Sequence, residues 1–237
     1  MNENEYIQIQ PETNRYEKAL PGVMAGVFLW MFVGLAVSAA AVVLTLTWPP
    51  LFAFVLGSEF GFYAMLIVEF ALVLSLTAAL RKLSPRAAAM LFLLYAFVNG
   101  LTLSTIFVVY SAGNITLAFL CTAGMFGFMA AYGALTKADL SGYKGFLMMG
   151  LVGIIIATLV NLLLKSDMLD MILCYAGIFI FVGLTAYDTQ KLKRMLSACG
   201  DEASVKKLRV IGALTLYLDF INIFLRLLQL LGRKGKR

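Results

Sequence analysis

The chain has 237 residues, of which 62% are hydrophobic and only 14% charged, and its mean hydropathy is +0.90. This composition excludes an ordinary soluble domain, because a protein dissolved in water carries far more polar residues. The net charge of +6 would suit nucleic acid in a soluble protein, but basic residues in membrane proteins mark the loops beside anionic lipid. We therefore expect a lipid bilayer as partner and no nucleic acid.

The chain contains no histidine. This absence excludes His-based acid–base catalysis, the usual serine and cysteine triads and haem ligation by histidine. The three cysteines, Cys121, Cys174 and Cys199, have no metal-binding spacing. We therefore expect no enzymatic activity and no cofactor, and any proton chemistry must use carboxylates.

Seven apolar stretches follow a polar N-terminal segment, residues 1–22. A membrane crossing needs about 20 apolar residues, and within lipid such a stretch must be helical. The stretches cover residues 23–47, 60–80, 87–109, 115–135, 146–164, 168–187 and 210–231. We therefore predict an all-α, polytopic membrane protein. Residues 23–231 form one domain, a bundle of seven transmembrane helices, and 232–237 form a basic tail.

The loops predict the orientation. Most are short and carry breakers such as Trp48-Pro49-Pro50, and only the loop at 191–209 is long. With a cytosolic N-terminus, thirteen Lys and Arg residues fall on the cytosolic side and only Lys165 in the outer loops. The basic tail opposes this arrangement, so the last stretch could instead be re-entrant, although its length favours a crossing. We expect a multi-pass protein of the plasma membrane.

Three carboxylates stand out within the apolar stretches or directly next to them. Glu69 is near the middle of the second stretch, and Asp219 lies about 15 Å beyond Arg209 at helical rise. Burying such a group costs at least about 2.5 kcal/mol, which favours a functional role over a structural hydrogen bond. Asp188 is nearer the cytosolic end of the sixth stretch, where a helix cap or an ion pair with Lys191 is an equally good interpretation.

The last stretch also carries a polar stripe. From Asp219, polar residues recur at Asn222, Arg226 and Gln229, with spacings of 3, 4 and 3 that place them on one helix face. We expect this stripe to turn inward, which would put the last helix at the centre of the bundle. Arg226 could then compensate carboxylates on neighbouring helices.

Two motifs resemble the Bax-inhibitor family of membrane proteins. They are Gly183-Leu184-Thr185-Ala186-Tyr187-Asp188-Thr189-Gln190-Lys191 and Leu216-Tyr217-Leu218-Asp219-Phe220-Ile221-Asn222-Ile223-Phe224. The resemblance covers the chain from the first span to the last. It implies seven helices with the last one central, and a calcium leak or channel governed by pH through an aspartate pair that matches Asp188 and Asp219.

The resemblance also implies roles for other residues. Glu69 matches an acidic residue that the family carries in its second helix, which places it on the ion path, and we expect Asn222 and Arg226 along the same path. A basic residue that latches to the aspartate pair corresponds to Arg81 or Lys82, one position out of register. No protein partner is implied.

The implied mechanism is chemically reasonable. Two carboxylates in one apolar site cannot easily both ionise, so they share a proton and titrate as a pair. When deprotonated they repel each other and offer oxygen ligands that could hold calcium transiently. Helix rise places Asp188 nearer the surface than Asp219, so the pairing requires a tilted or inwardly shifted sixth helix.

Two other classes compete with this interpretation. A presenilin-like intramembrane aspartyl protease would also place its aspartates on consecutive spans. Such enzymes carry Gly-x-Gly-Asp at the second aspartate and a Pro-Ala-Leu motif, whereas this chain has Leu216-Tyr217-Leu218-Asp219 and no proline after Pro85. The other alternative is a non-conducting membrane scaffold in stress protection.

Overall fold

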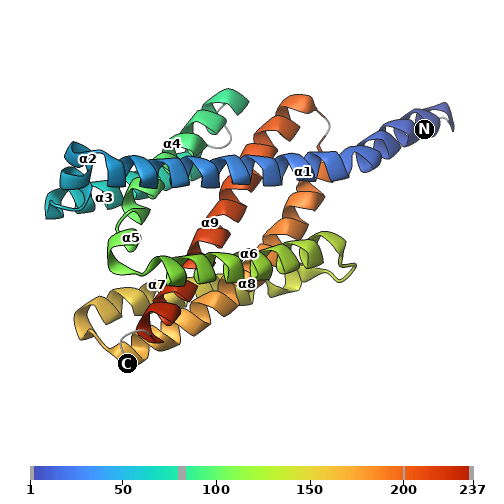
Figure 1. Ribbon diagram of the computed structural model, residues 1–237. Helices are drawn as coiled ribbons and strands as arrows, with labels where there is room; N and C mark the ends of the chain where they lie inside the picture. Colours follow the sequence, from blue (N-terminus) through green and yellow to red (C-terminus); the bar gives the residue numbers. More distant parts are fainter. Residues whose placement is uncertain (1–2, 80–83, 200, 235–237) are drawn as a thin grey trace.

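The computed structural model describes residues 3–79, 84–199 and 201–234, and no β-strand occurs in these ranges. Almost all of the described chain is helical (Figure 1). The elements are α1 (Glu3–Thr47), α2 (Pro49–Val55), α3 (Glu59–Ala79), α4 (Pro85–Leu103), α5 (Ile106–Val109), α6 (Ala112–Leu135), the 3₁₀ turn η1 (Leu140–Tyr143), α7 (Lys144–Leu164), α8 (Asp167–Ser197) and α9 (Glu202–Lys234).

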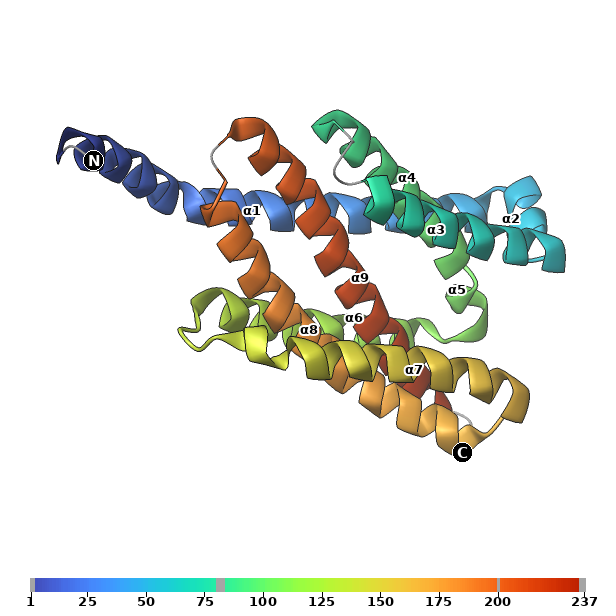
Figure 2. The same cartoon turned by 180° about the vertical axis from the view of Figure 1, so that it is seen from behind.

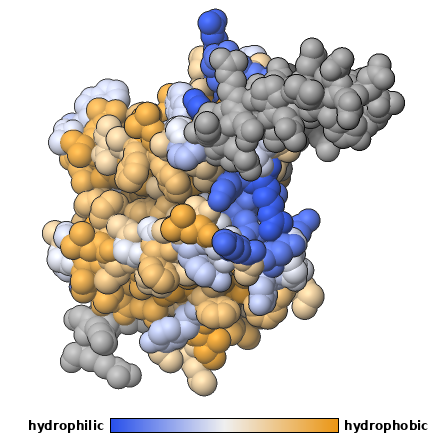
Figure 3. Space-filling model, turned by 90° about the vertical axis from the view of Figure 1, so that its right-hand side faces the viewer, coloured by the Kyte–Doolittle hydropathy of each residue, from blue (hydrophilic) through white to orange (hydrophobic). Residues whose placement is uncertain are grey.

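Six segments are long and apolar enough to cross a bilayer. They are Pro21–Thr47, Pro85–Val109, Ala112–Leu135, Leu140–Leu164, Asp167–Ser197 and Glu202–Gly232. The all-α, multi-pass class predicted from the sequence is therefore confirmed. The stretch predicted at 60–80 corresponds to α3, whose apolar part among the described residues is the shorter Tyr63–Ser75. Figure 3 shows the broad apolar surface that such a protein turns to lipid.

Local sequence explains where several helices begin. Ser84 and Ser111 each accept a hydrogen bond from a backbone amide in the first turn of the following helix, and Pro85 occupies the first position of α4. Ser166 caps α8 in the same way. At Trp48 the backbone is extended, and Pro49 then begins α2, so the predicted break is present and opens a further short helix.

Three boundaries differ from those predicted. Helix α1 begins at Glu3, so most of the polar N-terminal segment continues the first span as helix. The stretch at 87–109 is broken after Leu103, where the Ser104 and Thr105 hydroxyls donate to carbonyl groups of the preceding turn. The predicted loop at 191–209 is mostly helical, because α8 continues to Ser197 and α9 starts at Glu202. Lysine and arginine are good helix formers, so charge alone does not end a helix here.

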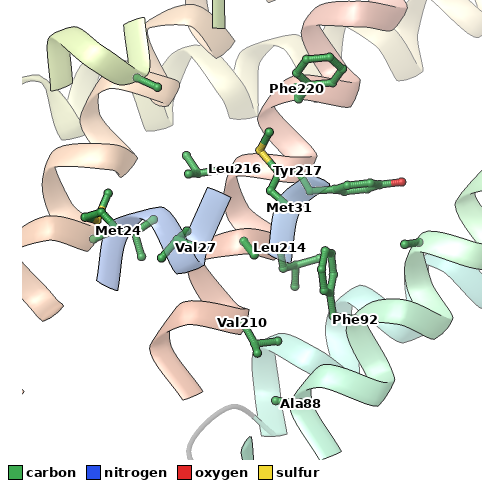
Figure 4. Close-up of a cluster of buried hydrophobic side chains, with 14 of the residues drawn as sticks. Met24, Val27, Met31, Ala88, Phe92, Val210, Leu214, Leu216, Tyr217 and Phe220 are labelled. Atoms are coloured by element: carbon green, nitrogen blue, oxygen red, sulfur yellow. The ribbon is translucent and has the colours of Figure 1, made fainter. Parts of the chain in front are cut away.

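Helix α9 lies at the centre of the bundle, as predicted. It packs against α8, α1, α6 and α4 (Figures 1 and 2). Its side chains Leu216, Tyr217 and Ile223 are completely buried. Figure 4 shows part of the main apolar cluster, in which side chains of α9 meet Val27 on α1 and Phe92 on α4.

Glycine allows two of the helix pairs to approach closely. A Cβ atom on Gly100 of α4 would collide with the backbone of Ser38 on α1, and one on Gly133 of α6 would collide with the backbone of Ala186 on α8. Small residues permit such backbone contact between membrane helices. The second contact brings α6 against α8 two residues before Asp188.

Candidate functional site

Helix α9 turns polar side chains toward two opposite neighbours. Tyr217 and Asp219 are two positions apart, which on an α-helix separates their directions by about 200°. Tyr217 faces α1 and α4, where it bonds to Ser38 and Asn99. Asp219 faces α8 and Asp188. The central helix therefore takes part in two separate polar clusters.

The first cluster is the carboxylate pair. Asp219 is only 5% exposed, and Asp188, on α8, is half-buried. The two carboxyl groups lie close enough for the charge of Asp188 to act on Asp219. Within the described part of the chain, Oδ2 of Asp219 is buried without a hydrogen-bond partner. The structure thus brings together the two aspartates that the sequence singled out.

The length of α8 explains how the pair can form. The predicted sixth span ended at residue 187, which would have left Asp188 at the membrane surface. Because α8 continues to Ser197, Asp188 lies more than two turns inside the helix. It therefore reaches the level of Asp219 on the antiparallel α9.

Lys191 is the cation that acts on Asp188. Its Nζ lies 5.8 Å from the centre of the Tyr187 ring, over the ring face. Among the described residues no ion pair joins Lys191 to Asp188, so the predicted alternative of a simple interfacial ion pair does not form. Helix α6 and the Pro21–Thr47 span of α1 contain no charged residue. The pair is therefore set in largely apolar surroundings.

This arrangement can attract a cation without holding it tightly. Among the described residues, no group of three or more His, Cys, Asp or Glu side chains could hold a metal ion. A resident calcium site needs six to eight oxygen ligands. Two carboxylates can share a proton or give a passing cation temporary contacts.

The polar stripe continues from Asp219 along the interface between α8 and α9. Arg226 lies over Gly177, where an added Cβ atom would come within 3.2 Å of its Cγ and Nε atoms. Nη1 of Arg226 donates to Oε1 of Gln229 at 3.4 Å, and Sγ of Cys174 donates to the same oxygen at 3.2 Å. The inward stripe is thus present. Arg226 was also expected to compensate carboxylates on neighbouring helices, but in the described ranges no ion pair joins it to a carboxylate.

Asn222 bonds within its own helix, unlike Gln229 of the same stripe, which bonds across to α8. Its amide nitrogen donates to the carbonyl oxygen of Leu218, one turn earlier on α9, at 2.8 Å. The hydrogen bond stays within one helix and leaves the side chain half-buried. Asn222 therefore lies about one turn from Asp219 on α9, and among the described residues no hydrogen bond joins it to the carboxylate pair.

The second cluster joins α1, α4 and α9 through hydroxyl and amide groups. The Tyr217 hydroxyl donates to Oδ1 of Asn99 at 2.8 Å and lies 2.7 Å from Oγ of Ser38. The Ser38 hydroxyl also donates to the carbonyl oxygen of Ala96 at 2.7 Å. Sequence reasoning missed Ser38 and Tyr217 as partners, because a hydroxyl in an apolar helix carries no insertion penalty comparable to that of a carboxylate.

Glu69 belongs with this second cluster. Its carboxylate faces Asn99 and Thr102 on α4, and its charge acts on Tyr95 and Tyr217. Oε1 of Glu69 is buried without a hydrogen-bond partner in the described part of the chain. The structure therefore places Glu69 across α9 from the aspartates. The two latch candidates, Arg81 and Lys82, lie outside the described residues.

Comparison with known proteins gives one consistent result. The family described as "Inhibitor of apoptosis-promoting Bax1" matches residues 20–236. The inner membrane protein YbhL of Escherichia coli K12 is 46% identical over 213 residues, which cover 89% of this chain and 91% of YbhL. Uncharacterized proteins of Borreliella burgdorferi and Rickettsia prowazekii are 42% and 35% identical, covering 89% and 92% of this chain and 91% and 92% of their own lengths.

Proposed function

The chain belongs to the Bax-inhibitor family of multi-pass membrane proteins, and on that premise we propose that it is a pH-sensitive calcium leak gated by Asp188 and Asp219. One observation supports the proposal above all. Two carboxylates meet on the packed α8–α9 interface, and a buried oxygen of Asp219 has no hydrogen-bond partner among the described residues. A pair kept only for stability would be expected to have its oxygen atoms satisfied.

The closed state of the proposed gate is the protonated one. A proton shared between the two carboxyl groups lets one donate a hydrogen bond to the other, which ties α8 to α9. Lys191 is the charged group that acts on Asp188, and α6 and the α1 span contribute none. The protonation state of the pair therefore depends on the proton concentration on the side of the membrane from which Asp188 can be reached.

The open state follows from losing the shared proton. Two negative charges in apolar surroundings repel each other, which favours separation of α8 from α9. The same charges attract calcium, which prefers carboxylate oxygen atoms. Calcium flux should therefore rise as pH rises.

Other polar and charged residues lie along the proposed ion path. Glu69 supplies a second negative site across α9, and Asn222 supplies an amide next to the gate. Arg226 lies about 10 Å beyond Asp219 at helical rise, where its charge would repel a cation that continued along the α8–α9 interface. We propose that Arg226 limits flux on that side, and that the protein transports ions without catalysing a reaction or using a cofactor.

Calcium uptake into proteoliposomes at several pH values tests the proposal. The comparison includes the wild type, Asp188→Asn, Asp219→Asn and Glu69→Gln, with Asp139→Asn as a control because Asp139 is an exposed carboxylate outside the interface. The wild type and the control should respond to pH, and the two gate variants should not. Flux equal to that of empty liposomes in every sample would overturn the leak and favour a scaffold.

A further inference from the structure

A long apolar groove separates α1 from α6. It consists of two adjoining cavities of about 650 and 270 Å³ that share Leu35, Ala39, Phe119 and Phe220. Helix α1 packs on α4 and α9, and α6 packs on α8 and α9. Figure 1 shows α1 and α6 on different levels with α9 passing between them. Phe220 of α9 therefore forms the floor of the groove.

Small residues keep the groove open. Helix α1 contributes Ala36 and Ala39, and α6 contributes Ala123, Gly127 and Ala131. A Cβ atom on Gly127 would meet no atom within 4 Å. The space is therefore free of protein side chains at this point and is accessible from the surface of α6.

The groove lies at the depth of the lipid hydrocarbon. Both α1 and α6 contain segments that can span the bilayer. The lining runs along α1 from Phe28 to Val42, about 21 Å at helical rise, within about 30 Å of hydrocarbon. The Ser38 hydroxyl in the lining is already bonded inward to Ala96 and paired with Tyr217. The lining has one other hydroxyl, that of Thr116, and no amide or charged side chain, so the groove is almost entirely apolar.

The opening of the groove selects among apolar occupants. The lining residues Phe32, Phe119 and Leu120 are 62%, 46% and 62% exposed, so the groove is open toward the surrounding hydrocarbon. Lipid next to α1 and α6 can therefore enter it directly from the bilayer. One flexible hydrocarbon chain fits, and the bilayer supplies such chains at high concentration.

We propose that the α1–α6 groove is a binding site for one acyl chain of a bilayer phospholipid. No charged side chain lines it, so recognition is by the chain and not by the headgroup. The bound chain would contact Phe220, the residue after Asp219, and would fill the space that protein packing leaves between α1 and α6. This inference does not depend on calcium transport.

The test uses a phospholipid with a photoreactive group in its acyl chain, mixed into phosphatidylglycerol and phosphatidylethanolamine vesicles that contain the purified protein. Gly127→Leu places a side chain in the groove. Gly124→Leu is the matched control, because Gly124 lies one turn away on α6, also has no atom within 4 Å of an added Cβ, and is not part of the lining. Ala123→Leu is a second groove-filling variant, in case Gly127→Leu does not fold.

Peptide mapping should find crosslinks on facing residues of α1 and α6. These crosslinks should be lost in Gly127→Leu or Ala123→Leu and kept in Gly124→Leu, and native mass spectrometry should show one fewer retained phospholipid. Equal labelling of the groove in the filled and control variants would overturn the proposal. A separate reaction with a bifunctional protein crosslinker that joined two copies through the groove would also overturn it, since that result would assign the space to a second copy.

Discussion

The two polar clusters on α9 differ in how their groups on α9 are satisfied, although Glu69, which faces the Tyr217 cluster from α3, also has a buried oxygen without a described partner. On the side of α1 and α4, the Tyr217 hydroxyl bonds to Asn99 and pairs with Ser38, and Ser38 bonds to a backbone carbonyl group. On the side of α8, two acidic groups meet and one oxygen of Asp219 has no described partner. Neutral donors and acceptors can satisfy one another within a membrane, whereas two carboxylates need a proton or a cation to do so. The cluster of Tyr217, Asn99 and Ser38 therefore has the character of a structural tie, and the aspartate pair has that of a switch.

Replacing Asp219 gives the strongest test of this difference. Asp219→Asn removes the charge that can appear at high pH, so the response of calcium flux to pH should be abolished, and Asp188→Asn should act in the same way. Thermal stability in detergent should stay the same or rise, because a buried ionisable group is replaced by a neutral amide of the same shape. An unchanged flux-versus-pH curve would make the pair merely structural.

Tyr217→Phe should have the opposite effect to Asp219→Asn: it should lower stability and leave the pH response of calcium flux unchanged. The substitution removes the hydroxyl that links α9 to α4 and α1. It should therefore lower the free energy of unfolding by about 1–2 kcal/mol, which a detergent titration in mixed micelles measures. The pH response of flux should persist. Tyr175→Phe is the control, because Tyr175 is exposed on α8. A loss of the pH response without a loss of stability in Tyr217→Phe would reverse the assignment of the two clusters.

Glu69→Gln tests whether the second cluster also carries ions. Glutamine keeps the shape of the side chain and can still bond to Asn99 and Thr102, so we expect a smaller stability change than for Tyr217→Phe. If Glu69 lines the path, calcium flux should fall severalfold at every pH while the shape of the pH curve is kept. Flux equal to the wild type would restrict Glu69 to a structural role.

The smallest effect is expected outside the membrane, at Asp139. The backbone amide and hydroxyl of Ser141, together with Arg194, lower the pKa of Asp139 to about 2. Because this pKa is below the ordinary value of about 4, the interaction stabilises the fold above that value and is lost as pH falls from about 4 toward 2. Asp139→Asn should remove this small part of the acid sensitivity of the melting temperature. High salt should reduce the effect in the wild type, since the Arg194–Asp139 pair is exposed.

Much of the candidate site was predictable from single residues in their local context. A carboxylate inside an apolar helix stands out because its insertion cost depends on the hydropathy of its own segment, and Glu69 and Asp219 were found in this way. Asp188 was assigned to the site through the resemblance of its motif to the Bax-inhibitor family. The partners of these residues were not predictable. Tyr217 and Ser38 are ordinary residues of membrane helices, and their bond joins positions 179 residues apart.

Apolar length and the 3.6-residue period are local properties, so the amino-acid sequence was enough to predict an all-helical membrane protein with a central last helix. The three-dimensional structure was needed to show that α8 extends into the predicted loop and brings Asp188 to Asp219, that Glu69 joins the Tyr217 cluster, and that α1 and α6 leave a groove between them. These outcomes depend on which helix faces meet and how closely glycine lets them approach. Long-range packing determines these contacts, and no periodic pattern in the sequence predicts them.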